Sequence, residues 1–190
     1  VQGDWLGNLT INNSFRTVLS LNADSIIPKL DDLRLRARTE QPDILSVCES
    51  KLDKSIPDAY IHVPGYNIFR ADRTRNGGGV LLYVKSELNA IRIEKLNSKS
   101  PDEYLWVRLS AGGSTSYLCS AYRPPASNAA IFSALGKNIK HIKSLKRKAR
   151  IILVGDFNTH NAAWLGSRDG AGKPSTNDAG RTCQSLCENL

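Results

Sequence analysis

The sequence lacks the features that would indicate a membrane or secreted protein. It has 190 residues, with no methionine, only three histidines and only four cysteines. No apolar run approaches the roughly 20 residues that a membrane-spanning helix needs, and no charged-then-apolar segment near the start is typical of a secretory signal. We therefore expect no membrane partner. Since the sequence starts at Val1 and has no methionine, we also expect a piece of a longer product, or a trimmed one.

The few cysteines favour buried free thiols. Cys48 and Cys119 lie inside apolar runs, where an unpaired cysteine is usually buried. Cys183 and Cys187 are four residues apart and share one helical face. A zinc site usually combines two pairs of ligand residues, with the cysteines of a pair at shorter spacing, and the sequence has no second such pair. We expect a reducing, intracellular setting.

Acidic residues are scarce relative to basic ones. The sequence has 26 Lys and Arg against 18 Asp and Glu, a net charge of +8, and a pI of about 9.5. This surplus favours a polyanionic partner, and its sign alone leaves DNA, RNA and lipid headgroups open. Basic residues crowd into 137–150, and apolar residues that alternate with them at spacings of three and four, from Phe132 to Leu145, predict an amphipathic helix. Its cationic side fits either a solvated surface or a phosphate contact.

The hydrophobic content of 41% and the charged content of 23% are ordinary for a globular domain and exclude disorder throughout. Residues 1–14 are polar and aperiodic, and we predict a loose leader there and one domain over 15–190. Apolar runs predict strands over 15–21, 44–48, 66–69, 80–84, 90–93, 104–109, 116–122 and 151–154. Helices are predicted over 26–38, over the cationic stretch and over 179–190. Runs of strands between helical stretches indicate an α/β fold in which helices cover stacked sheets.

Polar residues follow the ends of several predicted strands, where a rigid scaffold presents reactive groups to solvent. They are Asn22, Glu49, Tyr122, Asp156 and Asn158. Each also has a structural interpretation, because Asn and Asp commonly make turns after strands and Tyr is often partly buried. The carboxylates of Glu49 and Asp156 suit Mg²⁺, which prefers oxygen ligands. The Asn158 amide could hold a phosphate oxygen or orient a water molecule.

These residues belong to a series of motifs whose order and spacing are specific. The series runs Leu21–Ser25, Pro42–Leu45 before Glu49, Pro64–Tyr66, Arg70–Arg73 before Gly77–Gly79, Ala121–Pro125, Gly155–Asn158 and His160–Gly166. It resembles the endonuclease/exonuclease/phosphatase family, and more narrowly the apurinic-type endonuclease domain of non-LTR, LINE-like retrotransposons. The resemblance implies a DNase I-like fold, a four-layer α/β/β/α sandwich of two mixed sheets.

The resemblance also implies a role for each matching residue. Glu49 would be the principal Mg²⁺ ligand, with Mn²⁺ as a substitute, Asn22 would assist it, and Asp24 would serve a second metal position. Tyr122 would contact the scissile phosphate. Asp156 would align or deprotonate the attacking water, and Asn158 would hold the phosphate or the water. Arg73 and Arg123 would contact backbone phosphates of DNA.

The function implied by the resemblance is a Mg²⁺-dependent endonuclease that nicks one strand of duplex DNA. The freed 3′-hydroxyl would prime reverse transcription in the nucleus, by a reverse transcriptase domain of the same parent polypeptide. The family's late Ser-Asp-His block is absent, so we expect a domain that is incomplete at its C-terminus and binds metal better than it catalyses. Two alternatives stay open. One is a phosphatase of the same fold, and the other is an inactive fragment that binds nucleic acid through 137–150 and 70–75.

Overall fold

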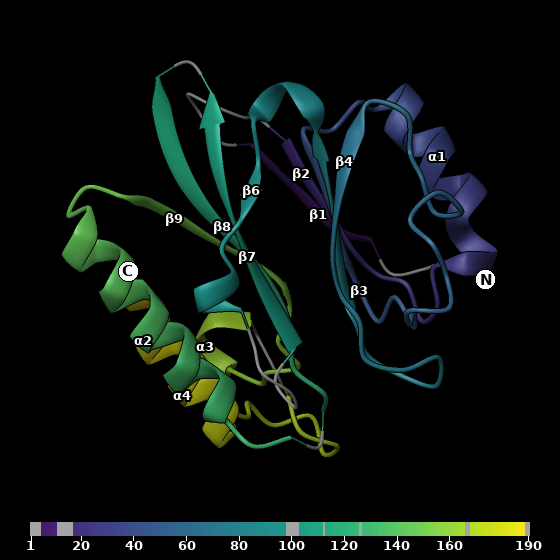
Figure 1. Ribbon diagram of the computed structural model, residues 1–190. Coiled ribbons are helices and arrows are strands. Elements are labelled where there is room, and N and C mark those ends of the chain that lie inside the picture. Colours follow the sequence, from purple (N-terminus) through teal and green to yellow (C-terminus); the bar gives the residue numbers. More distant parts are fainter. Residues whose placement is uncertain are drawn as a thin grey trace. The chain divides into compact units, whose positions relative to one another are not determined.

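The computed structural model describes residues 5–10, 17–97, 103–111, 113–125, 127–165 and 168–188 (Figure 1). The chain divides into two compact units. The first consists of residues 1–122 and 150–156, and the second of residues 123–149 and 157–190. None of the helices in the described ranges has the length and apolar content that are required to cross a bilayer.

The first unit is built on two mixed β-sheets. One sheet has the strand order β1 (Trp5–Thr10), β2 (Thr17–Asn22), β3 (Ile44–Cys48), β5 (Val80–Lys85) and β4 (Tyr66–Ala71). The other has the order β6 (Ile91–Arg92), β7 (Glu103–Ala111), β8 (Ser114–Tyr122) and β9 (Arg150–Asp156). Neighbours β2 and β3 are parallel, as are β8 and β9, and the remaining pairs are antiparallel. The short 3₁₀ helices Ser86–Leu88 and Glu94–Leu96 flank β6.

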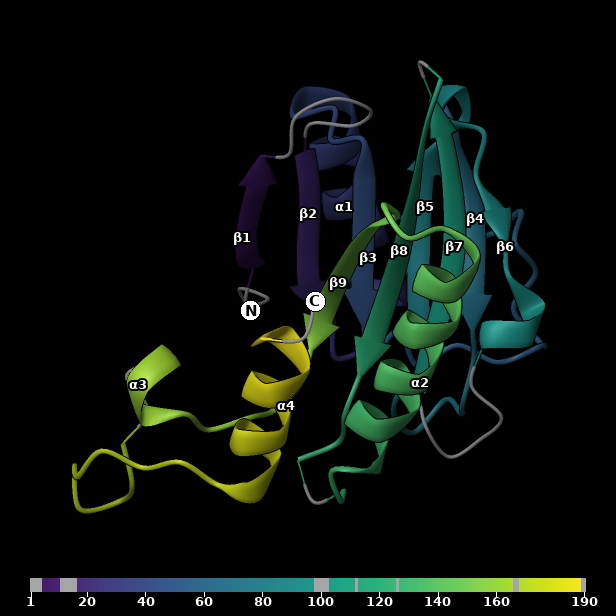
Figure 2. The ribbon, with the colours of Figure 1, turned by 90° about the vertical axis from the view of Figure 1, so that its left-hand side faces the viewer.

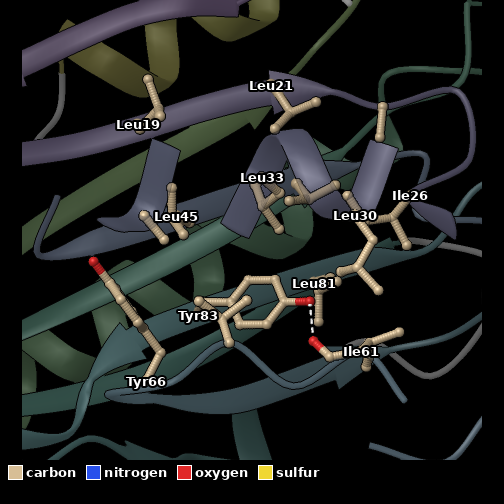
Figure 3. Packing of buried hydrophobic residues seen from close by; sticks show 14 of the residues in the cluster. Leu19, Leu21, Ile26, Leu30, Leu33, Leu45, Ile61, Tyr66, Leu81 and Tyr83 are labelled. Atoms are coloured by element: carbon tan, nitrogen blue, oxygen red, sulfur yellow. Dashed lines mark hydrogen bonds between the residues drawn. The ribbon is translucent and has the colours of Figure 1, made fainter. Parts of the chain in front are cut away.

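One hydrophobic core lies between the first sheet and helix α1 (Leu30–Thr39), which follows the 3₁₀ turn Ile27–Lys29. Leu30, Leu33 and Ala37 recur at helical spacing and are buried in one cluster with residues of β2, β3 and β5 (Figure 3). In the same cluster, the hydroxyl of Tyr83 donates a hydrogen bond of 2.8 Å to the carbonyl of Ile61. Helix α1 therefore covers one face of this sheet.

A second core lies between the two sheets. It takes Ile44, Leu82 and Val84 from the first sheet and residues such as Leu105 and Leu118 from the second. Both faces of β3 and β5 are covered, so these strands are continuous apolar runs rather than alternating ones. The sheets also share polar contacts, since the hydroxyl oxygens of Ser46 and Ser120 lie 2.8 Å apart. The predicted α/β fold of two stacked mixed sheets is confirmed.

The second unit contains α2 (Ala130–Leu145), the single turn α3 (Ala162–Leu165) and α4 (Asp178–Glu188). Helices α2 and α4 contact each other, as Figure 2 shows. The rings of Phe132 and Phe157 pack with their centroids 6.0 Å apart. The amide of Asn161 donates a hydrogen bond of 2.8 Å to Gln184 of α4. The unit thus has an internal apolar contact and a link from the loop after β9 to α4.

Two local predictions need correction. The prediction of a loose leader over 1–14 is wrong for Trp5–Thr10, which pairs antiparallel with β2 as an edge strand. Trp5–Thr10 neither alternates regularly between apolar and polar residues nor forms a continuous apolar run, so its residues do not predict a strand. The short helix α3 was not predicted, because four residues are too few to show a helical period. Residues 1–4 and 11–14 of the predicted leader lie outside the described residues.

Candidate active site

The carboxyl ends of four strands meet in the first unit. Asn22 ends β2 opposite Cys48 of the parallel strand β3, and Tyr122 ends β8 opposite Asp156 of the parallel strand β9. Parallel neighbours end at the same edge of a sheet, so Asn22 and Glu49 leave the first sheet together, and Tyr122 and Asp156 leave the second together. Strand β2 contacts β9, and β3 contacts β8 and β9, so the two edges face each other.

Hydrogen bonds join the four side chains into what we call the strand-end cluster: Asn22, Glu49, Tyr122 and Asp156. The Asn22 amide nitrogen donates to Glu49 Oε1 at 2.8 Å and to Asp156 Oδ2 at 2.9 Å. The Tyr122 hydroxyl donates to Glu49 Oε1 at 2.8 Å. One carboxylate from each sheet therefore contacts a single amide group. Four of the five residues predicted to be catalytic are brought together.

The backbone around Glu49 is in an unusual conformation. Glu49 has φ 52°, in the left-handed region that few non-glycine residues adopt and that is typical of functional sites. The loops after β2 and β3 are bonded to each other, from Ala23 N to Cys48 O at 2.8 Å and from Ser25 N to Glu49 O at 2.9 Å. These bonds fix the loop that carries Glu49 against the end of β2, so the Glu49 side chain stays beside Asn22.

Gly155 allows β9 to lie close against β8. Its φ is 141°, which L-residues rarely adopt. A Cβ on Gly155 would lie 2.8 Å from the carbonyl carbon and 2.9 Å from the nitrogen of Ala121, and nearer still to its oxygen. Real Cβ atoms essentially never come within 3.0 Å of such neighbours. The glycine therefore sets the approach of the two strands one residue before Asp156.

Burial and neighbouring carboxylates control the protonation of Tyr122 and Cys48. Burial, followed by the hydrogen bond to Glu49, raises the pKa of the Tyr122 hydroxyl well above its ordinary value. Tyr122 therefore stays protonated at neutral pH and keeps donating to the Glu49 carboxylate. Burial also raises the pKa of the Cys48 thiol to about 12. Cys48 is thus a structural thiol beside the cluster rather than a thiolate nucleophile.

Asp24 lies outside the strand-end cluster. Its side chain is 72% exposed and forms an ion pair with Lys51. The hydrogen bond and charge of Lys51 hold the pKa of Asp24 below its ordinary value. The link from Asp24 to the cluster is through the backbone, because its N–H donates to Asn22 Oδ1 at 3.2 Å. A metal position at Asp24 stays a prediction.

Glu103 is a buried carboxylate that the sequence analysis missed. It is only 5% exposed, it lies opposite Tyr122 in the register of β7 and β8, and it accepts hydrogen bonds from Arg73 at 2.7 Å and from the Gly79 N–H. A Cβ on Gly78 would collide with the same carboxylate. Arg73, predicted to contact DNA, is thus held by Glu103 while its side chain stays 49% exposed.

Arg123 and Asn158 belong to the second unit and are joined to each other. Arg123 is 5% exposed, and its guanidinium donates to the carbonyls of Asn158 at 2.9 Å, Asn128 at 3.2 Å and Ser127. The Asn158 amide donates back to the Arg123 carbonyl at 2.8 Å. These bonds give Arg123 a structural role in its loop, and a phosphate contact by Arg123 or Asn158 stays a prediction.

The sequence profile described as "Endonuclease/Exonuclease/phosphatase family" matches residues 19–185. The chain belongs to this family. A comparison with curated proteins gives no match.

Several solved structures share the fold of this family. The endonuclease domain of TRAS1, a telomere-specific non-LTR retrotransposon, is 18% identical with a TM-score of 0.65, covering 90% of this chain and 70% of that one. The AP endonuclease LMAP from Leishmania major is 16% identical with a TM-score of 0.68, covering 90% and 65%. The 3′-5′ exonuclease NExo from Neisseria meningitidis is 17% identical with a TM-score of 0.65, covering 90% and 70%. At these identities the likeness shows the DNase I-like fold.

Members of this family typically depend on a metal ion. Among the described residues, no three His, Cys, Asp or Glu side chains are grouped closely enough to form a metal site by themselves. The strand-end cluster nevertheless provides two carboxylates around one amide, and a hydroxyl. Mg²⁺ usually takes one or two protein carboxylates and keeps several waters, so the carboxylates of Glu49 and Asp156 fit it. Asn22 would have to turn its amide oxygen toward the ion, because its nitrogen faces both carboxylates.

Proposed function

We propose that the chain is a Mg²⁺-dependent endonuclease domain that hydrolyses a phosphodiester bond in one strand of duplex DNA. The observation that carries this proposal is the contact of Glu49 and Asp156, one from each sheet, with the single amide of Asn22. The membership of the chain in a family of phosphoesterases supports hydrolysis of a phosphate ester.

Each residue of the strand-end cluster has a chemical role in this proposal. Glu49 and Asn22 would hold Mg²⁺, which when bound would stabilise the charge that develops on the phosphoryl oxygens. Asp156 would orient the attacking water and accept its proton. Tyr122, which stays protonated, would donate to an oxygen of the scissile phosphate. Asn158 would hold the phosphate or the water.

DNA is the substrate that the charge and the similar structures favour. The net charge of +8 attracts a polyanion. The similar proteins include the endonuclease domain of a non-LTR retrotransposon and an AP endonuclease. We propose that Arg73, held by Glu103, contacts a backbone phosphate. By the same analogy, the nick would prime reverse transcription in the nucleus, with the reverse transcriptase in the same polypeptide.

The test is nicking of supercoiled plasmid by the purified chain in Mg²⁺, read as conversion to the relaxed circle. Glu49→Gln and Asp156→Asn each keep the shape of the side chain and remove its charge, and we expect each to lower nicking at least about 100-fold. Glu40→Gln is the matched control, because Glu40 is an exposed partner of Arg36 on α1, and it should nick at the rate of the parent chain.

Two results would count against the proposal. Full activity in Glu49→Gln or Asp156→Asn would mean that the strand-end cluster does not take part in the reaction. Release of phosphate from small phosphomonoesters, without any nicking of plasmid, would favour a phosphatase in its place.

A further inference from the structure

Positive charge is concentrated in one part of the chain. Residues 104–155 contain nine Lys and Arg and no Asp or Glu. Six of these basic residues lie within 137–148, in the second half of α2 and the turn that follows it. The net charge of +8 therefore has a specific location rather than being spread over the surface.

Helix α2 separates an apolar face from a basic one. Its buried residues recur at helical spacing: Ile131, Phe132, Leu135, Ile139 and Ile142. Its exposed residues include Lys137 and Lys140, and the exposed residues Lys146, Arg147 and Lys148 continue the charge into the turn. We call these five cations the α2 basic surface. None of them has an ion-pair partner among the described residues.

The uncompensated charge fits a polyanion, and the rest of the helix indicates which kind. An amphipathic helix that binds a membrane inserts its apolar face, but the apolar face of α2 is already buried in the protein. Leu145, 71% exposed, is the one large hydrophobic side chain on the described part of this helix that faces solvent. Proteins that hold single strands stack bases on several aromatic rings. In α2, Phe132 is 2% exposed, and the single imidazole of His141 is the exposed ring. Contact with the phosphates of a duplex is therefore the mode of polyanion binding that suits this helix.

The spacing of the cations suits a phosphate backbone. Lys137 and Lys140 are three residues apart on the helix, which rises about 4.5 Å between them, at 1.5 Å per residue. One strand of B-DNA carries a charge about every 3.4 Å along the axis, so these two cations can face neighbouring phosphates, and the three cations of the following turn add further contacts. We propose that the α2 basic surface binds the backbone of duplex DNA without reading its sequence, as a contact made by residues other than the strand-end cluster. The choice of DNA rests on the proposed function.

The experiment compares two triple variants with equal charge change. One is Lys137→Gln with Lys140→Gln and Lys148→Gln. The control is Arg38→Gln with Lys95→Gln and Lys173→Gln, which are exposed residues elsewhere on the chain. Binding to a 30-base-pair DNA duplex in EDTA is measured by fluorescence anisotropy at several salt concentrations, with circular dichroism to confirm folding. The parent chain is measured in the same way. Binding of all three proteins to a 30-base-pair RNA duplex and to vesicles of phosphatidylserine and phosphatidylcholine is measured as well.

We expect the α2 variant to bind duplex DNA at least about tenfold more weakly at 100 mM salt, with a salt slope reduced by about 2 to 3. The control variant should change the slope by less than about 1. An equal loss in both variants would mean that only net charge matters and would overturn the proposal. So would a loss of RNA or vesicle binding in the α2 variant with duplex DNA binding unchanged.

This outcome is separable from that of the proposed function. Glu49→Gln should lower nicking at least about 100-fold and leave the salt slope of DNA binding as in the parent chain. If no chain nicks plasmid but the α2 variant alone loses duplex binding, the endonuclease proposal fails and the binding surface stands.

Discussion

The close approach of β9 to β8 gives the sharpest prediction about the architecture of the site. Gly155→Ala places a methyl group against the backbone of Ala121, at 2.8 and 2.9 Å from its carbonyl carbon and nitrogen. Backbone atoms cannot rotate away as a flexible side chain can, so the two strands must separate. The substitution also puts an L-residue at φ 141°. Both effects act one residue before Asp156.

The size of the effect follows from these two causes. A non-glycine residue at a positive φ costs about 1–3 kcal/mol. Displacement of β9, the edge strand that pairs with β8, adds a comparable amount, so we expect Gly155→Ala to lower the free energy of unfolding by at least about 3 kcal/mol. The matched control is Gly113→Ala, because Gly113 has φ 77° but no atom within 4 Å of its added Cβ. The control should cost only about 1 kcal/mol.

Urea denaturation followed by circular dichroism measures the free energy of unfolding of both variants. Plasmid nicking measures the activity of the site. A displacement of about 1 Å at a catalytic group can cost about 100-fold in rate, so Gly155→Ala should also nick poorly under conditions where it is folded. If Gly155→Ala were no less stable than Gly113→Ala, the reasoning that glycine sets the spacing of β8 and β9 would be refuted.

Three further predictions concern single side chains. Tyr122→Phe removes the hydroxyl that donates to Glu49, and should slow nicking about 100-fold while the free energy of unfolding falls by less than about 2 kcal/mol; unchanged nicking would contradict the assignment. Glu103→Gln removes the buried charge that holds the half-exposed Arg73, and should lower the free energy of unfolding by about 2 kcal/mol in urea; a stability equal to the parent's would contradict the role of Glu103. Burial raises the pKa of Cys183 to about 12, above the ordinary 9.0, so the folded state keeps this proton while the unfolded state loses it. The contribution of this group to the free energy of unfolding should therefore be complete below pH 9. Between pH 9 and pH 12, the free energy of unfolding should fall by up to about 1.4 kcal/mol per pH unit. Cys183→Ala should show a shallower fall, and an identical pH profile would contradict the burial argument.

Much of the fold could be predicted because the central strands are buried on both faces. The runs at 44–48 and 80–84 are apolar without alternation, and they form β3 and β5. The ends of two apolar runs, 44–48 and 151–154, also indicated the site, since Glu49 follows β3 directly and Asp156 ends β9. Motif order predicted that these residues share one site.

The parts that could not be predicted depend on contacts that are distant in the sequence. Glu103 begins an apolar strand, and its partners Gly79 and Arg73 lie 24 and 30 residues away, so nothing local marks it as buried and bonded. Arg123 carries a charge that suggests a phosphate, and only the structure shows its guanidinium donating to three carbonyls. Asp24 lies two residues from Asn22, yet its carboxylate pairs with Lys51. Charge and motif position indicate candidates, and packing decides among them.

The central claim is that Glu49, with Asn22, holds a divalent cation beside Asp156, where the ends of β3 and β9 face each other. Anomalous diffraction from crystals soaked in Mn²⁺ tests this claim most directly. We expect a peak within bonding distance of Glu49 and beside Asp156 in the parent chain, and its loss in Glu49→Gln. A Mn²⁺ peak elsewhere, with the strand-end cluster free of metal, would contradict the account.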